Sequence, residues 1–445
     1  MMTIDEAAQA IGAGPAASGW IESVATDTRT MTPGCLFFAL RGARFDGHAF
    51  LRDAAAQGAV AAVTDRPCEP GWPPCLVVPD TRLALGRLAA YWRRKMGARV
   101  LAVTGSNGKT SVKEMTARIL AVEQSGIATR GNLNNDIGVP LTLLRLRPSH
   151  RYAVIEMGMN RHGEIAALAA LAAPDVAVVT NAGHAHLAGL GTVEAVAREK
   201  GSLYPALGPG GIAIINADDP YAAYWRGLAR GPVWTYGLSA SADVSARFTL
   251  GGQGTELAIE ARGWTAALPV RLAVLGRHNV ANALAATALS LAVGASRDAI
   301  AVGLARTVPV AGRLEGVAGR AGSRVIDDSY NANPDSARAA LAVLADLPGE
   351  RWFVLGDMAE LGEGGAALHR SFGEAASAAG IEHLWTLGTL SAEASRAFGG
   401  GARHYEDQET LLRDLQAALH KDAVVLIKGS RSMRMERLVS ALRAS

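Results

Sequence analysis

The chain has 445 residues, of which 49% are hydrophobic and 19% are charged, which is ample material for large buried cores. At roughly one domain per 150 residues, this length predicts about three domains. The 44 basic and 41 acidic residues leave a net charge of +3, too weak a field to argue for a nucleic-acid partner. No stretch approaches the ~18 consecutive apolar residues of a membrane span, and the N-terminal MMTIDEAAQAIGAG lacks the apolar segment of a signal peptide. We therefore expect a soluble, cytoplasmic protein.

The number and spacing of the cysteines predict their redox state. They are Cys35, Cys68 and Cys75, an odd number without a C-x-x-C pair. Such a pattern is typical of reduced thiols rather than of a disulfide framework or a zinc site. We therefore expect three free cysteines.

Residues 1–80 combine short apolar strands with a helix. The expected strands are CLFFAL, AVAAVTD and CLVVPD, and the expected helix lies near HAFLRDAAAQG. Because Pro and Gly bound these segments, the pattern predicts a small α/β domain. A helix over TRLALGRLAAYWRRK then leads into the next domain.

Two further α/β domains follow, at 81–308 and 309–445. In the first, the continuous apolar runs RVLAVTG, YAVIEMG, DVAVVTN, GIAIIN and PVWTYG predict a buried parallel sheet covered by helices. Residues 243–275 have shorter, alternating stretches and Gly turns, which indicate an antiparallel appendage. After the linker PVAGRLE, the strands RVIDDSY, RWFVLGD, HLWTLG and AVVLIKG alternate with helices and predict a Rossmann-like domain. The expected fold is three α/β domains.

The segment VTGSNGKTS, at 103–111, predicts a phosphate site in the central domain. It departs from the usual G-x-x-x-x-G-K-[ST] loop, because Gly105 stands two residues too close to the Gly-Lys pair. The alternative is an ordinary Gly-rich turn whose lysine points to solvent, but the strand before the segment and the helix after it favour a P-loop. Lys109 can neutralise phosphates, and the Thr110 hydroxyl can bind Mg²⁺. The expected nucleotide contacts are Gly105, Ser106, Asn107, Gly108, Lys109 and Thr110.

Polar residues at other strand ends extend this candidate site. Glu156 ends the strand YAVIE, where a carboxylate suits Mg²⁺, although a surface salt bridge would also explain it. The loop TNAGHAHLAGLG places His184 and His186 after a strand, which leaves a binding site and simple solvation equally open. Lys200 alone suggests nothing, since helix lysines are usually surface charges.

The short motif TG-[ST]-NGKT resembles that of the Mur ligases, the ATP-dependent amide-forming enzymes of peptidoglycan synthesis, to which folylpolyglutamate synthases are related. The resemblance extends over essentially the whole chain. It implies that Thr110, Glu156 and His186 bind Mg²⁺. It also implies that Lys200, within the matching KG motif, is carbamylated by CO₂ and so holds Mg²⁺ or aligns the phosphoryl acceptor.

The same resemblance implies the remaining nucleotide contacts. The segment GRHNVANALAA resembles the family's adenine-contacting helix start. PVAGRLE matches the linker arginine, here Arg313, which approaches the γ-phosphate when the domains close. DDSYNANP matches a strand end whose acid, here Asp328, contacts the ribose. The adenine-side residues are His278, Asn279 and Asn282.

Four local motifs, GNLNNDIGVPLTLL, DDSYNANPDS, LGDMAELG and KGSRSMRME, resemble those of the family's dipeptide-adding member. The implied reaction joins UDP-MurNAc-tripeptide to D-Ala-D-Ala through an acyl phosphate, using ATP and Mg²⁺. The implied catalytic residues are Lys109, Lys200, His186 and Arg313. The implied substrate contacts are Thr28 and Arg29 for UDP, Asn134 and Asn135 for the peptide, and Tyr330, Asn331 and Asp357 for the dipeptide.

Other functions remain open at this point. The nearest alternative is the third-residue-adding ligase or a folylpolyglutamate-synthase-like ligase. A non-catalytic nucleotide-binding regulator would not need Glu156, His186 and Lys200 together, and a P-loop switch or motor would not use the short loop. We expect a monomer, and the third residue of the peptide is left open.

Overall fold

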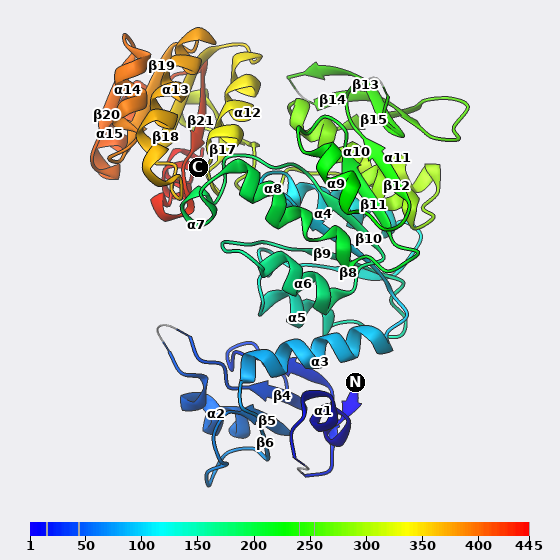
Figure 1. The fold of residues 1–445 in the computed structure, drawn as a ribbon. Helices are drawn as coiled ribbons and strands as arrows, with labels where there is room; N and C mark the ends of the chain where they lie inside the picture. The colour runs from blue at the N-terminus through cyan, green and yellow to red at the C-terminus, as the bar shows by residue number, and fades with distance from the viewer. Residues whose placement is uncertain (15–16, 43–44, 240, 253, 445) are drawn as a thin grey trace.

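The computed structural model describes residues 1–14, 17–42, 45–239, 241–252 and 254–444. Three α/β domains follow one another along the chain (Figure 1). The N-terminal domain, in blue, lies at one end, and helix α3 (Thr81–Lys95) lies between it and the green central domain. The C-terminal domain, yellow to red, packs beside the central domain away from the N-terminal one. No helix of the described residues is long and apolar enough to cross a membrane.

The N-terminal domain contains a parallel sheet in the order β3-β4-β5-β6 and an antiparallel pair, β1-β2. All four residues of β4 are buried, as its apolar sequence predicts. The strands are β1 (Met2–Thr3), β2 (Trp20–Ile21), β3 (Ser23–Ala25), β4 (Cys35–Phe38), β5 (Ala61–Thr64) and β6 (Cys75–Val77). The helices before α3 are α1 (Ile4–Ile11), the 3-10 turn η1 (Gly47–Phe50) and α2 (Leu51–Ala56).

The cysteines differ from the sequence prediction. Cys68 and Cys75 form a disulfide with a Cα–Cα distance of 5.6 Å, so the prediction of three reduced thiols is wrong. The physical reason is local, because the Pro- and Gly-containing segment between them turns back, with Trp72 N–H bonded to the carbonyl of Glu69. The turn brings the two Cα atoms within bridging range. Cys35 is free, and burial raises its thiol pKa to about 11.

The central sheet has the order β15-β14-β13-β12-β11-β10-β7-β9-β8. The strands from β12 to β8 are parallel, and β13, β14 and β15 pair antiparallel, which confirms the predicted appendage. The strands are β7 (Arg99–Thr104), β8 (Gly126–Ala128), β9 (Tyr152–Glu156), β10 (Val176–Val179), β11 (Ile212–Asn216), β12 (Val233–Tyr236), β13 (Val244–Gly251), β14 (Gly254–Ala261) and β15 (Leu268–Leu272). The helices are α4 (Lys109–Leu120), α5 (Gly138–Leu143), α6 (Glu164–Ala172), α7 (Leu187–Leu190), α8 (Val193–Gly201), α9 (Ala222–Leu228), α10 (Arg277–Ala292) and α11 (Arg297–Ala305).

Strand β7 shows how this sheet is buried on both faces. Its side chains alternate, so that Leu101 and Val103 join the core under α4, α10 and α11. Val100 and Ala102 face the opposite way and join a core that also contains α3 and the N-terminal strands. The N-terminal domain and one face of the central sheet therefore share one hydrophobic core.

The C-terminal sheet has the order β16-β17-β21-β18-β19-β20, parallel except for β16. The carboxyl ends of its parallel strands lie at one edge, where a doubly wound sheet binds ligands. The strands are β16 (Glu315–Ala318), β17 (Arg324–Asp328), β18 (Glu350–Gly356), β19 (His383–Leu387), β20 (Ala402–Tyr405) and β21 (Ala423–Lys428). The helices are α12 (Pro334–Ala345), α13 (Gly365–Ala378), α14 (Ala392–Phe398), α15 (Gln408–Ala418) and α16 (Glu436–Leu442).

Candidate active site

A cavity of about 1290 Å³ opens between the central and C-terminal domains and extends to the start of α3. Most of the residues predicted for the site line it, although they come from distant parts of the chain. They are Ser106, Asn107, Gly108, Lys109, Thr110, Asn134, Asn135, Glu156, His186, His278, Asn279, Asn282, Arg313, Asp328, Tyr330 and Asn331. The predicted residues that do not line it are Thr28, Arg29, Gly105, Lys200 and Asp357.

The P-loop turns at two glycines. Gly108 has a left-handed backbone, with φ 82°, and caps α4. A Cβ at Gly108 would lie 2.3 Å from Asn282 Oδ1, and one at Gly105 would lie 1.8 Å from Thr180 Oγ1. Both positions therefore require glycine, for the turn and for the close approach of neighbouring side chains.

The loop after β10 fixes the P-loop backbone. Asn107 N–H donates to Asn181 Oδ1 at 2.9 Å, and Ser106 N–H donates to the Asn181 carbonyl at 2.9 Å. Thr180 Oγ1 donates to the Asn107 carbonyl at 2.5 Å. The sequence analysis gave Thr180 and Asn181 no role, although both directly follow β10, the strand beside β7, and this position could have suggested one.

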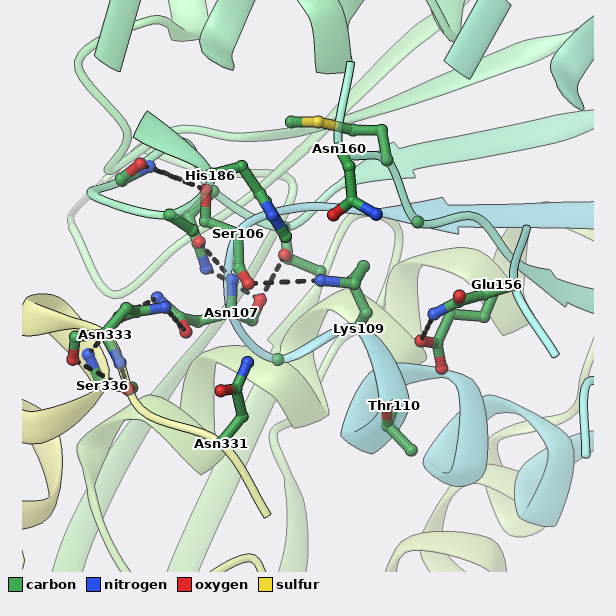
Figure 2. Close-up of a pocket in the computed structure, with 18 of the residues that line it drawn as sticks. Ser106, Asn107, Lys109, Thr110, Glu156, Asn160, His186, Asn331, Asn333 and Ser336 are labelled. Atoms are coloured by element: carbon green, nitrogen blue, oxygen red, sulfur yellow. Dashed lines mark hydrogen bonds between the residues drawn. The ribbon is translucent and has the colours of Figure 1, made fainter. Parts of the chain in front are cut away.

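Lys109 lies over the loop that precedes it. Its Nζ donates to the carbonyls of Gly105 at 2.7 Å and Ser106 at 3.2 Å (Figure 2). Burial lowers the pKa of Lys109 to about 8, with the Glu156 charge opposing the shift and Arg313 adding to it. A phosphate beside this amine would favour its charged form.

Glu156 ends β9 and is only 2% exposed. Its Oε1 accepts a hydrogen bond from Asn134 Nδ2 at 2.8 Å, and its backbone N–H donates to Thr129 Oγ1 at 2.9 Å. Oε2 is buried and has no hydrogen-bond partner within the described ranges. A buried carboxylate oxygen without a donor suits a cation, and Thr110 adds a hydroxyl to the same cavity. These residues fit Mg²⁺.

Of the two remaining predicted metal ligands, His186 lines the cavity and Lys200 does not. His186 Nδ1 lies 2.9 Å from Glu360 Oε2. Lys200, on α8, is 1% exposed. Burial, followed by the nearby Lys109 charge, holds the pKa of Lys200 well below its usual value, against the opposing charge of Glu199. In the described part of the chain, no three His, Cys, Asp or Glu residues cluster as a metal site, so the oxygen of Thr110 and a modified lysine would have to complete the predicted set.

The start of α10 carries the three residues predicted to contact adenine, and all three line the cavity. Asn279 Nδ2 donates to the Leu275 carbonyl at 2.8 Å, and Asn282 Nδ2 donates to Asn279 Oδ1 at 3.0 Å. Burial lowers the pKa of His278 to about 4, assisted by the charge of Lys428. A neutral ring and two fixed amides therefore face the cavity.

Arg313 and Asp328 lie where the C-terminal part of the chain meets the P-loop side of the cavity. Arg313 donates from NH2 to Thr110 Oγ1 at 3.3 Å, and its guanidinium lies 4.5 Å from the centre of the Tyr330 ring. Asp328 Oδ2 accepts from Lys428 Nζ at 2.5 Å, yet burial raises the pKa of Asp328 despite this partner. Lys428 lines the cavity and was not predicted.

A second contact between the two domains involves the P-loop itself. Asn333 Nδ2 donates to Asn107 Oδ1 at 2.9 Å, and His184 N–H donates to Asp335 Oδ2 at 2.6 Å. Figure 2 shows Asn107 of the P-loop beside Asn333, which caps α12 with Ser336. Sequence reasoning missed Asn333 and Asp335, although an Asn-Pro-Asp helix start is a local cap signature.

Some predicted residues have structural contacts instead. The two carboxylate oxygens of Asp357 accept from the N–H groups of Thr389 at 3.0 Å and Ser391 at 2.7 Å. Asn135 Oδ1 accepts from the N–H of Gly138, the first residue of α5, at 2.9 Å. Thr28 and Arg29 lie in the N-terminal domain, where Arg29 pairs with Asp27 at 2.6 Å. The ligand contacts assigned to these residues stay predictions.

Known proteins resemble the chain along its whole length. Residues 21–93 match the profile "Mur ligase family, catalytic domain", 103–290 match "Mur ligase middle domain" and 312–431 match "Mur ligase, glutamate ligase domain". The UDP-N-acetylmuramoyl-tripeptide–D-alanyl-D-alanine ligase of Escherichia coli (strain K12) is 47% identical over 95% of this chain and 94% of its own. The chain belongs to the Mur ligase family.

Solved Mur ligase structures agree with this membership. MurF from Acinetobacter baumannii superposes with a TM-score of 0.91 at 35% identity, covering 99% of this chain and 98% of that one. MurF ligase from Thermotoga maritima, determined in complex with ADP, gives 0.84 at 28% identity over 94% and 96% of the two chains. The three-domain Mur ligase fold therefore underlies the cavity described above.

Proposed function

We propose that this chain is an ATP-dependent ligase that adds D-alanyl-D-alanine to UDP-N-acetylmuramoyl-tripeptide in peptidoglycan synthesis. The observation that supports this most strongly is the near full-length identity to the E. coli ligase of that name. The cavity adds independent support, since it brings a P-loop, a strand-end carboxylate and a linker arginine together. Those are the parts that phosphoryl transfer to a carboxylate needs.

Each phosphate-side residue has a role that its surroundings permit. Lys109 and Arg313 would place their positive charges beside the phosphoryl group that is transferred. The P-loop N–H groups at the start of α4 would bind the other phosphates of the nucleotide. Thr110 and Glu156 would hold Mg²⁺, with His186 and modified Lys200 completing the set. Bound there, Mg²⁺ would neutralise charge on the phosphate oxygens. ATP is the nucleotide that the family membership and the ADP-bound relative support.

Lys200 would act as a carbamate. A buried amine with a lowered pKa is largely neutral, and the neutral amine is the nucleophile that attacks CO₂. A nitrogen–carbon bond forms, one carbonyl electron pair moves onto oxygen, and the nitrogen releases a proton to solvent. The resulting anion would lie near the positive charge of Lys109, which favours it.

The ligase activity is tested with ATP, a panel of amine acceptors and, in separate reactions, UDP-MurNAc-tripeptide, UDP-MurNAc-dipeptide or a folate, with products identified by mass. We expect D-Ala-D-Ala to be the efficient acceptor. An amino acid joined instead to a UDP-MurNAc-dipeptide would assign the third-residue activity, and glutamate joined to a folate would assign the folylpolyglutamate one. ATP hydrolysis without amide product would reject the proposal.

The carbamate is tested separately from turnover. After incubation with ¹³C-bicarbonate, the ¹³C NMR spectrum should contain a carbamate resonance that the Lys200→Gln protein lacks. Lys200→Ala should abolish ligation, and added short-chain carboxylates should partly restore it. Undiminished activity in Lys200→Ala would remove the carbamate hypothesis.

A further inference from the structure

Two carboxylates of the C-terminal domain reach the histidine loop between β10 and α7. His184 donates its backbone N–H to Asp335 Oδ2 at 2.6 Å, and its ring Nδ1 lies 3.1 Å from Asp335 Oδ1. His186 Nδ1 lies 2.9 Å from Glu360 Oε2. Ala188 N–H donates to the Glu360 carbonyl at 2.9 Å, which joins the two loops by backbone as well. The loop is thus held from the other domain at both histidines.

The contact at His186 occupies one nitrogen of the ring. The side chain is 21% exposed, and its Nδ1 is shielded from water. Nδ1 makes no well-directed hydrogen bond within the described residues, and Glu360 Oε2 is the polar atom at ion-pair distance. The Glu360 side chain at this contact is 58% exposed. Nε2 then remains for another partner.

Glu360 is held in place for this contact. Its backbone is left-handed, with φ 62°, a conformation that a residue other than glycine adopts only when its surroundings enforce it. The other C-terminal acids at the cavity are already engaged, Asp328 by Lys428 and Asp335 by His184. Among the C-terminal acids that line the cavity, Glu360 is therefore the one whose side chain contacts His186.

A histidine that binds a metal through one nitrogen commonly donates its other N–H to a carboxylate, which fixes the tautomer and the ring orientation. We propose that Glu360 is a positioning residue that holds the Nδ1–H of His186, so that the Nε2 lone pair faces the Mg²⁺ site. Because Glu360 belongs to the C-terminal domain, the site is complete only when that domain lies against the central one. This inference rests on the proposed function for the role of His186.

The first test measures cation binding without turnover. Mn²⁺ serves as the probe, and free Mn²⁺ is counted by electron paramagnetic resonance in the presence of β,γ-methylene-ATP. Glu360→Ala should weaken Mn²⁺ binding by about tenfold, as loss of such a partner commonly does. Glu360→Gln should lose less, because its amide oxygen still accepts from Nδ1–H. The matched control is Glu363→Gln, an exposed acid outside the cavity, which should bind Mn²⁺ as the parent does.

A double-variant cycle makes the assignment specific to His186. If Glu360 acts through this ring, adding Glu360→Ala to His186→Gln should weaken Mn²⁺ binding no further. Full additivity of the two losses would overturn the proposal. Should Glu360→Ala fail to fold, Glu360→Gly decides it, because glycine suits the left-handed backbone and has no side-chain acceptor. A Mn²⁺ affinity and a His186 tautomer equal to the parent's in that variant would contradict the role.

The tautomer is a readout that a purely structural role would not change. In ¹⁵N-histidine-labelled protein, the His186 signals are identified by their loss in His186→Gln. The parent should have Nδ1 protonated, and Glu360→Ala should move the ring toward a mixture of tautomers. The same tautomer in both proteins would reject the proposal.

Failure of the proposed function is distinguishable from failure of this inference. If the parent makes no amide with D-Ala-D-Ala, the function fails whatever Mn²⁺ does. If the parent ligates normally and Glu360→Ala raises only the KM for D-Ala-D-Ala at unchanged Mn²⁺ affinity, Glu360 contacts the acceptor and the positioning role is overturned.

Discussion

Replacing Gly108 by alanine tests how far the free energy of unfolding depends on the backbone turn and the close packing of the P-loop. Two costs add at this position. A left-handed alanine costs about 1–2 kcal/mol, and the new Cβ would lie 2.3 Å from Asn282 Oδ1. Forcing an extra methyl group into a packed site costs about 1–3 kcal/mol. We therefore expect Gly108→Ala to destabilise the central domain by roughly 2–5 kcal/mol.

The two costs can be separated with Asn282. Asn282→Ala alone removes a hydrogen bond to Asn279, worth about 1 kcal/mol. In the double variant the backbone cost of alanine at Gly108 remains, but the collision does not. The double variant should therefore be more stable than the sum of the single losses by about 1–3 kcal/mol.

The assay is calorimetry of the four proteins without ligand. For a domain of this size, each kcal/mol lowers the transition by about 2–4 °C, so Gly108→Ala should melt roughly 10 °C lower. The affinity for ATP, measured by titration calorimetry, should fall in Gly108→Ala. Strict additivity, or a loss below about 1 kcal/mol for Gly108→Ala, would refute the account of close packing.

Other predictions concern buried polar groups. The His278 pKa of about 4 lies below the ordinary 6.5, so the stability that the neutral ring contributes is complete above pH 6.5 and is lost as the pH falls toward 4. His278→Gln should reduce this loss by up to about 2 kcal/mol at pH 5 in thermal unfolding, and an unchanged pH profile would contradict it. Lys113 is fully buried, and its Nζ donates to the Thr129 carbonyl at 2.8 Å. Lys113→Met should therefore lower the free energy of unfolding by about 1–3 kcal/mol in the same assay. An unchanged free energy of unfolding would show that the carbonyl finds another donor. Asp335→Ala removes the acceptor of the His184 N–H, which joins the central and C-terminal domains. Small-angle scattering of the nucleotide-bound variant should then give a larger radius of gyration than that of the parent. Equal radii would argue that this contact does not hold the two domains together.

The parts of the site that the sequence could predict are local. The P-loop follows from a strand, a short Gly-rich turn and a helix within a few residues, and Glu156 follows from its place at a strand end. The contacts that were missed join distant segments, as in the pair Asn107–Asn333, which is 226 residues apart. Neither asparagine has a distinctive local pattern for this pairing, which arises only when the C-terminal domain packs against the P-loop.

The disulfide error has a different origin. The prediction for Cys68 and Cys75 used the odd number of cysteines and the absence of a C-x-x-C pair, which describe classes of proteins. The pairing depends instead on the turn between them, which brings their Cα atoms to 5.6 Å. Glu360 was missed for a further reason, since its left-handed backbone and its contact with His186 are both set by tertiary structure.

The shared core at helix α3 decides how the molecule can move. Leu85, Leu88 and Trp92 of α3 are buried in the same hydrophobic cluster as Val100 of the central sheet and Leu36 of the N-terminal one. Separating those two domains would expose that cluster to water, so they travel as one body. The C-terminal domain contacts the central one through polar pairs such as Asn107–Asn333 and His184–Asp335, which water can replace. The N-terminal and central domains therefore form one body and the C-terminal domain another, and a compound inserted between Asn107 and Asn333 would keep the two bodies apart from inside the cavity that both residues line.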